Sequence, residues 1–305
     1  MLYLSYDNTS HKDGFASQLQ RMLSIYCLAK EFGCAYLHNG FLDIEYQGLL
    51  ALENNQKSED FVRKANEIFP IASAEAPSIV DKVVKMTYFS PEIFSEATTQ
   101  NIVVYIVYAH KYIDTQTSVF RHLPSFSWIS PVRDTKKPLQ IAVHVRRGEL
   151  FLVDSNRLLP NEYFLHHMYA LVYICKSLGL NFAFTVYTEK PTQPRVISPQ
   201  YHGMCDRFAA DSLIYPGQTD ISLFENHPHT VCKVNTDPFE AFQEMCQADI
   251  LICSLSSFSY TAGLLNKQGH ILMPKQHFWH GVPESWIDTD REGDFMKLLP
   301  LLQDR

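Results

Sequence analysis

The most distinctive pattern in the sequence is an apolar segment that ends in two adjacent arginines. Residues 141–149 read Ile-Ala-Val-His-Val-Arg-Arg-Gly-Glu. Ligands of open α/β sheets bind beyond the carboxyl ends of strands, and guanidinium groups bind phosphate oxygens in bidentate fashion. Gly148 would let the backbone turn sharply behind Arg146 and Arg147. The pattern favours a diphosphate site over its alternative, a network of Arg and Glu side chains on the surface at a strand end.

A second pattern places serines after another apolar segment. Residues 248–259 read Ala-Asp-Ile-Leu-Ile-Cys-Ser-Leu-Ser-Ser-Phe-Ser, which predicts a strand, a turn and the start of a helix. Unpaired N–H groups and hydroxyls at a helix N-terminus bind anions, although serines also cap helices where no ligand binds. Combined with the arginines, Ser256, Ser257 and Phe258 are expected to form the second side of a diphosphate pocket.

Three other residues are weaker candidates for the same ligand. Gly14 and Gln18 stand at the start of the first predicted helix, where a glycine lets a ligand approach the backbone and a glutamine can bond a sugar. A turn glycine followed by a first-turn glutamine is an equally good account of this segment. The carboxylate of Asp237 suits the ring N–H and amino group of guanine, but an N-cap of a helix that begins at Pro238 is the stronger interpretation.

The segments around these residues predict alternating strands and helices. Residues 43–100 are expected to be mainly helical, and 101–109 form a buried strand or helix, which periodicity cannot separate. The remaining expected elements are strands at 2–6, 34–38, 139–145, 181–187, 249–254 and 270–273, and helices at 15–32, 161–178, 238–247 and 258–265. This order predicts an α/β fold of two doubly wound, Rossmann-like domains facing a cleft. Residues 123–138, with three prolines, are the expected linker, which gives domains at 1–134 and 135–305.

Composition limits the class of protein. The 305 residues are 46% hydrophobic and 19% charged, which is typical of a globular chain with a substantial core. A net charge of −7 argues against general binding of nucleic acid. We find no apolar run of about 20 residues and no basic, signal-like start. The seven cysteines lack Cys-x-x-Cys spacing, so reduced thiols, a cytoplasmic location and no membrane span are expected.

Several other classes of site lack their sequence patterns. Asp288-Thr289-Asp290 has the letters of a metal-binding Asp-x-Asp, but it stands in a charged segment near the C-terminus, where we expect a surface loop. The thirteen histidines form no His-Glu-x-x-His or Cys/His pattern, so no metal site is expected. Gly-x-x-x-x-Gly-Lys, Gly-x-Gly-x-x-Gly and Gly-x-Ser-x-Gly are also missing, which argues against P-loop kinases, classical dehydrogenases and serine hydrolases.

Residues 144–149, His-Val-Arg-Arg-Gly-Glu, resemble the His-x-Arg-Arg-x-Asp motif of the α1,2-, α1,6- and protein O-fucosyltransferase superfamily. Residues 246–266 are similar to the C-terminal donor motif of that superfamily. Residues 14–18 resemble its Gly-x-x-x-Gln segment, and residues 187–191 resemble its strand-end Thr-Asp-Asp-Pro. The order of these short segments extends over most of the chain.

The resemblance implies a GT-B-like fold, a GDP-sugar donor, inversion at the anomeric carbon, and neither a metal nor a separate cofactor. It assigns Arg146 to the donor β-phosphate, His144 and Arg147 to support of the pocket, and Ser256 and Ser257 to phosphate binding. The N-terminal domain would hold the acceptor and the C-terminal domain the GDP-sugar. One departure is Glu149, where the family usually has Asp.

The implied reaction transfers fucose, or a related 6-deoxyhexose, to a hydroxyl of a glycan or glycoconjugate acceptor. A carboxylate must take the acceptor proton. Asp154 lies near the place where the α1,6 enzymes have their base, and Glu149 is the rival candidate. Two alternatives stay open: a binding protein for nucleotide-sugars or glycans without turnover, and a transferase that uses GDP-rhamnose or another GDP-hexose.

Overall fold

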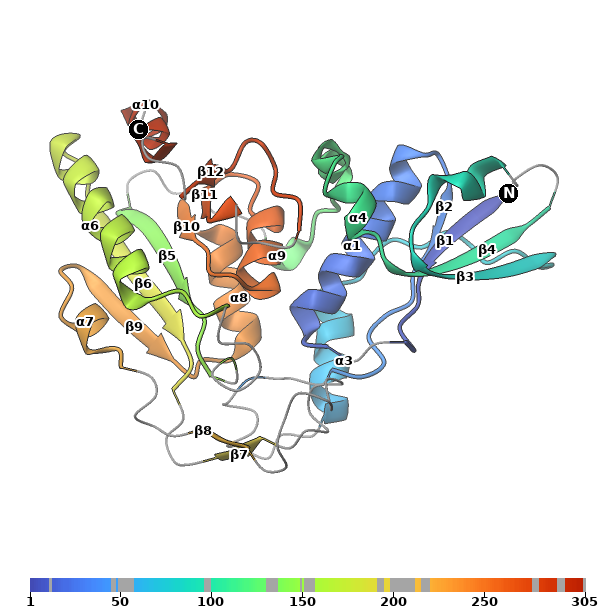
Figure 1. The fold of residues 1–305 in the computed structure, drawn as a ribbon, viewed down its shortest axis with the longest axis horizontal. Helices are drawn as coiled ribbons and strands as arrows, with labels where there is room; N and C mark the ends of the chain where they lie inside the picture. The colour runs from blue at the N-terminus through green and yellow to red at the C-terminus, as the bar shows by residue number, and fades with distance from the viewer. Residues whose placement is uncertain are drawn as a thin grey trace. The chain divides into compact units, whose positions relative to one another are not determined.

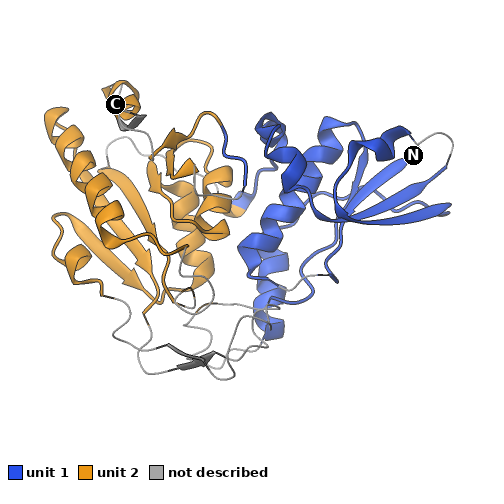
Figure 2. Ribbon diagram, viewed as in Figure 1, with its two compact units in different colours: residues 1–46, 56–127, 279–283 blue, residues 47–55, 128–278, 284–305 orange. Residues whose placement is uncertain are grey.

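The computed structural model describes residues 1–10, 13–44, 48, 58–95, 100–129, 137–148, 150, 157–190, 195–197, 212–214, 220–275, 280–289 and 294–303. The chain divides into two compact units, shown in Figure 2. Unit 1 comprises Met1–Tyr46, Gln56–Ser127 and Trp279–Pro283, and unit 2 comprises Gln47–Asn55, Trp128–Phe278 and Glu284–Arg305.

Unit 1 contains a four-stranded sheet in the order β2-β1-β4-β3, in which all neighbours are parallel (Figure 1). The strands are β1 (Leu2–Tyr6), β2 (Ala35–Leu37), β3 (Lys82–Tyr88) and β4 (Ile102–Tyr108). Every residue of β1 and most of β4 are buried. Continuous apolar segments of this kind are typical of parallel strands covered on both faces, and β4 therefore settles the strand-or-helix ambiguity of residues 101–109.

The helix α1 (Phe15–Glu31) follows β1 and packs against it. It ends where the sequence predicts, because Gly33 takes φ +66°, a backbone conformation that glycine adopts without steric cost. The other helical elements of unit 1 are α3 (Ser58–Ile68), α4 (His110–Ile113), η1 (Pro91–Ser95) and η2 (Thr117–His122).

Unit 2 contains a six-stranded parallel sheet in the order β12-β11-β10-β5-β6-β9. The strands are β5 (Leu139–Val145), β6 (Phe182–Thr188), β9 (Thr230–Val234), β10 (Ile250–Ile252), β11 (His270–Met273) and β12 (Ile287–Asp288). The chain builds outward from β5 to β9, then returns to the other side of β5 with β10. This is the strand order of the Rossmann fold, and its reversal lies between β5 and β10.

Helices cover both faces of this sheet (Figure 1). A separate antiparallel pair is formed by β7 (Arg195–Ile197) and β8 (Ser212–Ile214). The helical elements are α6 (Asn161–Ser177), α7 (Ser222–Glu225), α8 (Pro238–Gln247), α9 (Ser257–Leu265), α10 (Leu298–Gln303), η3 (Ser127–Ile129) and η8 (Asp294–Lys297). None of the described helices has both the length and the apolar composition needed to cross a bilayer.

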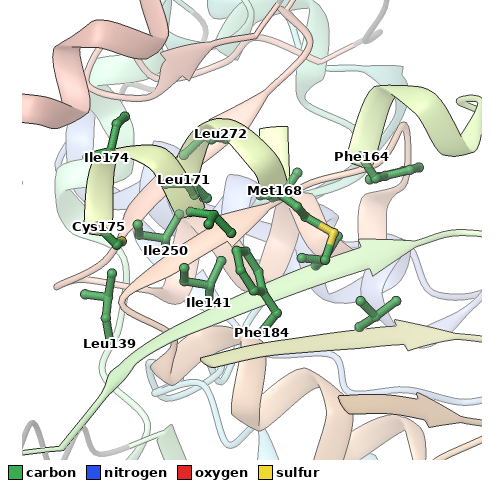
Figure 3. Close-up of a cluster of buried hydrophobic side chains, with 14 of the residues drawn as sticks. Leu139, Ile141, Phe164, Met168, Leu171, Ile174, Cys175, Phe184, Ile250 and Leu272 are labelled. Atoms are coloured by element: carbon green, nitrogen blue, oxygen red, sulfur yellow. The ribbon is translucent and has the colours of Figure 1, made fainter. Parts of the chain in front are cut away.

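The core of unit 2 lies between α6 and one face of the sheet (Figure 3). Phe164 and Leu171 of α6 pack there with Ile141 and Phe184 from adjacent strands. Because side chains alternate along a strand, the β5 residues that stand between these core residues point to the opposite face of the sheet. His144 is one of them, and that alternation directs it toward α9.

The predicted α/β class with two Rossmann-like units is confirmed. Most predicted elements agree with the structure within one or two residues. The expectation of a mainly helical segment at 43–100 is wrong for residues 82–88, which form β3. Five of its seven side chains are exposed at the sheet edge, and lysines, which protect edge strands, interrupt its apolar pattern. The short strands β7, β8, β9 and β12 were not predicted either. The expectation of a surface loop at Asp288 is wrong, because this residue belongs to β12 and is 3% exposed.

Candidate functional site

The candidate site of unit 2 lies where the strand order reverses, at the carboxyl ends of β5 and β10. The register pairs Val143 with Ile252, so the two strands end side by side. Arg146 and Gly148 follow β5, while Ser254 and Ser256 follow β10. In open α/β sheets this crevice is where ligands bind, and the structure thus brings together the two patterns that the sequence placed about a hundred residues apart.

His144 connects the two strand ends. Its side chain is buried, with 6% of its surface exposed. The Nδ1 atom lies 3.0 Å from the Ser254 hydroxyl, and the ring centroid lies 5.2 Å from that of Phe258. Burial holds the pKa of His144 well below its usual range, and the positive charges of Arg146 and Arg147 lower it further. The imidazole is therefore neutral at physiological pH and adds no charge to the site.

Arg146 directly follows β5 and is paired with a carboxylate that follows the neighbouring strand. The register of β5 and β6 pairs Val145 with Thr188, so Arg146 and Glu189 each stand one residue beyond a strand end. Nη1 of Arg146 forms an ion pair with Oε2 of Glu189. The Arg146 side chain keeps 14% of its surface exposed. It is thus a positioned cation whose charge is balanced within the protein.

Arg147 has a different environment from its neighbour. Its Nη1 donates to the Arg146 carbonyl at 2.8 Å and its Nη2 donates to Oδ1 of Asn161 at 2.6 Å. The guanidinium also lies 5.9 Å from the centroid of Phe164. Burial lowers the pKa of Arg147 to about 10, so it remains charged at neutral pH. These contacts tie the end of β5 to the start of α6, and Gly148 then turns the chain with φ +67°.

The serine-rich turn forms the N-terminus of α9. The Ser256 hydroxyl accepts from the Phe258 N–H at 3.2 Å, which caps the helix. Ser257 is buried. The Ser259 hydroxyl lies within hydrogen-bonding distance of the Ser254 backbone, which holds the turn together. The structure therefore shows the serine cap. The N-terminus of α9 also follows β10, the neighbour of β5, and the dipole of a helix favours an anion at this end.

The other predicted donor residues have local structural partners. Asp237 caps α8 by accepting from the N–H groups of Phe239 and Glu240 at 2.8 and 3.2 Å. Gln18 belongs to unit 1, is 1% exposed, and donates to the carbonyls of Asp13 and Asp43 at 2.8 and 2.7 Å.

Gly14 precedes α1 with φ −59°, a conformation open to any residue. Both predicted bases, Glu149 and Asp154, lie outside the described residues.

Three residues with no assigned role in the sequence analysis are now part of the site: Glu189, Asn161 and Ser254. Glu189 could have been found, because it follows an apolar strand in the same way as Arg146. The partnerships of Asn161 and Ser254 depend on which strands are neighbours, which no local pattern shows. Among the described residues, no group of three or more His, Cys, Asp or Glu side chains could hold a metal ion.

Comparisons with known proteins add a distant structural likeness. No protein-family model matches the chain, and no curated protein sequence matches it. The structure is similar to a crystal structure of POFUT1 in complex with GDP, with 11% identity and a TM-score of 0.40 over 88% of this chain and 96% of that chain. POFUT1 in complex with GDP-fucose gives 11% identity and a TM-score of 0.38 over 88% and 95% of the two chains. At this distance the likeness establishes no family for the chain, and its function has to be argued from its own residues.

Proposed function

We propose that this chain is an inverting glycosyltransferase that needs no metal ion and transfers fucose, or a related 6-deoxyhexose, from a GDP-sugar to a glycan hydroxyl. The observation that supports it is the joining of two anion-binding elements at the strand reversal of unit 2. Arg146 follows β5, and the serine-capped N-terminus of α9 follows the adjacent β10. A diphosphate is the ligand whose charge suits both.

Each site residue has a separate task in this proposal. Arg146 binds the β-phosphate of the donor, and the first turn of α9 with Ser256 and Ser257 binds the neighbouring phosphate oxygens. His144, which is neutral and hydrogen-bonded to Ser254, keeps the two strand ends in register. Arg147 fixes the backbone from which the Arg146 side chain extends, through its bonds to the Arg146 carbonyl and Asn161.

The reaction breaks the bond between the anomeric carbon and the phosphate oxygen. Negative charge then grows on the leaving GDP, while the sugar passes through an oxocarbenium-like state, as in glycoside hydrolysis. Preorganised donors stabilise such charge because they need not reorient during the reaction. The acceptor oxygen attacks the opposite face of the sugar and loses its proton to a carboxylate, for which we propose Asp154, with Glu149 as the rival.

Glu189 adds a further step to donor binding. Without a ligand its carboxylate pairs with Arg146, a largely buried cation whose burial costs free energy unless it is paired. When the donor binds, the β-phosphate takes over part of this role. The ion pair therefore holds the guanidinium in place before the donor arrives.

Calorimetric titration tests the donor site directly. GDP, UDP and GDP-fucose would be titrated into the whole protein in EDTA, for the wild type, Arg146→Ala and Arg63→Ala. Arg63 is the matched control, because it lies exposed on α3 in weak surface ion pairs. We expect GDP to bind selectively, Arg146→Ala to weaken binding by at least about tenfold, and Arg63→Ala to bind as the wild type does.

The outcomes separate binding from turnover. No GDP binding, or binding only with a divalent ion, would overturn the proposal. GDP binding without release of fucose from GDP-fucose to any glycan acceptor would instead favour a binding protein. If turnover is found, Asp154→Asn and Glu149→Gln identify the base, because loss of the base lowers kcat and leaves GDP affinity unchanged.

A further inference from the structure

A glycine from the N-terminal half of the sequence lies against the carboxylate that pairs with Arg146. Gly48 belongs to unit 2, as do Glu189 and Pro238, although it is far from both in the sequence. It is buried and takes φ +91°. Glycine adopts such a backbone conformation without the steric cost that a Cβ atom brings. The backbone conformation is thus one reason for a glycine at this position.

The space around Gly48 is a second reason. A Cβ atom placed on Gly48 would lie 3.3 Å from Oε1 of Glu189 and 3.1 Å from Cγ of Pro238. Both distances are shorter than the separation at which non-bonded atoms attract each other best. The other oxygen of the same carboxylate, Oε2, pairs with Nη1 of Arg146. One oxygen of Glu189 therefore faces Gly48, while the other holds the arginine.

Of the two neighbours of Gly48, Pro238 is the more rigid. It is the first residue of α8, and the preceding residue, Asp237, caps that helix by accepting from two backbone N–H groups. The proline ring also fixes its own backbone angle. The side chain of Glu189 has rotatable bonds instead. A side chain at position 48 would therefore displace Glu189 more readily than the start of α8.

We propose that Gly48 is a positioning residue for the phosphate-binding arginine. The absence of a side chain leaves room for the Glu189 carboxylate, and that carboxylate holds the Arg146 guanidinium before a ligand arrives. A cation that is already in place need not be ordered when an anion binds, which favours binding. Gly48 touches no ligand in this account, because it acts through Glu189. The role in donor binding rests on the proposed function, in which Arg146 binds the β-phosphate of a GDP-sugar.

Gly179 provides a matched control within the same unit. It also has a positive φ, +69°, but no atom lies within 4 Å of a Cβ atom placed on it. Asparagine is the suitable replacement at both positions, because it tolerates a positive φ better than most residues. Gly48→Asn and Gly179→Asn share the change of residue and a positive φ, while only Gly48→Asn adds atoms next to Glu189.

NMR of the arginine side chains in the whole, ligand-free protein tests the link to Arg146. The ¹⁵Nε–H signal of Arg146 is assigned by its loss in Arg146→Lys. We expect Gly48→Asn to shift this signal and Gly179→Asn to leave it in place. In the background Glu189→Ala, the change Gly48→Asn should cause no further shift, because the carboxylate that it displaces is gone. An unchanged Arg146 signal in folded Gly48→Asn would overturn the proposal.

Calorimetric titration with GDP in EDTA then tests the role in donor binding. Gly48→Asn should weaken GDP binding by at least about threefold, and Gly179→Asn should bind as the wild type does. With Glu189→Ala as the background, Gly48→Asn should leave GDP affinity unchanged. If Gly48→Asn does not fold, Gly48→Ala makes the same comparison with Gly179→Ala.

The outcomes separate this proposal from the transferase function. Wild-type affinity for GDP in Gly48→Asn, or an equal loss with and without the Glu189 carboxylate, would contradict the positioning role. A wild-type protein that binds no GDP would reject the transferase, and the Arg146 signal would still decide whether Gly48 positions this side chain.

Discussion

Arg146 and Arg147 are adjacent residues of the same type with different environments. The Arg146 side chain keeps 14% of its surface exposed and pairs with the carboxylate of Glu189. Arg147 is buried and bonded to the backbone and to Asn161. Because successive side chains at a strand end point in different directions, the pair cannot act as a double phosphate clamp without rearrangement. At the scale of residues, the candidate site is therefore centred on Arg146.

The exchange Glu189→Gln tests the ion pair that holds Arg146. It removes the negative charge of the carboxylate that pairs with the mostly buried Arg146 side chain, so we expect the free energy of unfolding to fall by about 1–3 kcal/mol. Saturating GDP should then raise the Tm of the variant more than that of the wild type, because phosphate replaces the missing charge. Both effects can be measured by denaturant titration and by thermal melting with and without GDP.

Asp60→Asn is the control for this variant. Asp60 also pairs with an arginine, at 3.1 Å, but both side chains are more than half exposed, and exposed pairs contribute less than about 1 kcal/mol. Equal GDP-induced shifts of Tm in Glu189→Gln and wild type would show that Glu189 does not share Arg146 with a ligand.

At the scale of elements, the candidate site consists of strand ends and helix starts. β5 and β10 end in parallel, and α9 begins directly after the second of them with a serine cap. The start of α8 near β9 is similar, with Asp237 as its cap. A capping side chain and a ligand-binding side chain thus occupy the same kind of position, which is why the sequence left two interpretations of Asp237 and of Ser256.

Two exchanges at Asp237 separate these interpretations. Asp237→Ala removes the cap and should lower the free energy of unfolding by about 1 kcal/mol. Asp237→Asn keeps a capping oxygen and should recover most of that loss, and we expect its GDP affinity to match the wild type. Denaturant titration and calorimetry measure the two quantities. A marked loss of GDP affinity in a stable Asp237→Asn would instead assign this carboxylate to the guanine.

At the scale of the whole molecule, buried histidines link stability to pH. Burial lowers the pKa of His144, His167 and His227 in unit 2 and of His38 and His110 in unit 1. Folded histidines of this kind stay neutral where the unfolded chain, with a pKa near about 6.5, takes up protons. Protons therefore favour the unfolded state, and stability is complete above that value and is lost as the pH falls below it.

His167 gives this effect a measurable size. Its burial, with a contribution from His166, lowers the pKa of His167 to about 4. Between pH 7 and pH 5 this one group should therefore remove about 1–2 kcal/mol of stability. Denaturant titration at both pH values should show a smaller loss in His167→Gln than in wild type by that amount. The same loss in both proteins would mean that His167 does not titrate as described.

The local elements followed from the sequence because their causes are local. The buried segments at residues 2–6 and 139–145 are short and apolar, Gly33 supplies the conformation that ends α1, and Asp237 and Pro238 start α8. Ligands of open α/β sheets bind beyond the carboxyl ends of strands, and this rule drew attention to the polar residues that follow the predicted strands. The edge strand β3 was not predicted, because its sequence has no clear apolar pattern. It is a strand because it pairs with β4.

What the sequence determined by itself is thus the α/β class with two Rossmann-like units and the presence of cationic and serine-rich strand ends. The tertiary structure alone decided which strands are neighbours, because pairing in a parallel sheet joins segments that are far apart in the chain. That pairing places Ser254 against His144, Glu189 against Arg146 and Tyr88 against Tyr108. It also decided the different partners of the two adjacent arginines, because Glu189 of the neighbouring strand end pairs with Arg146 and Asn161 of α6 bonds to Arg147.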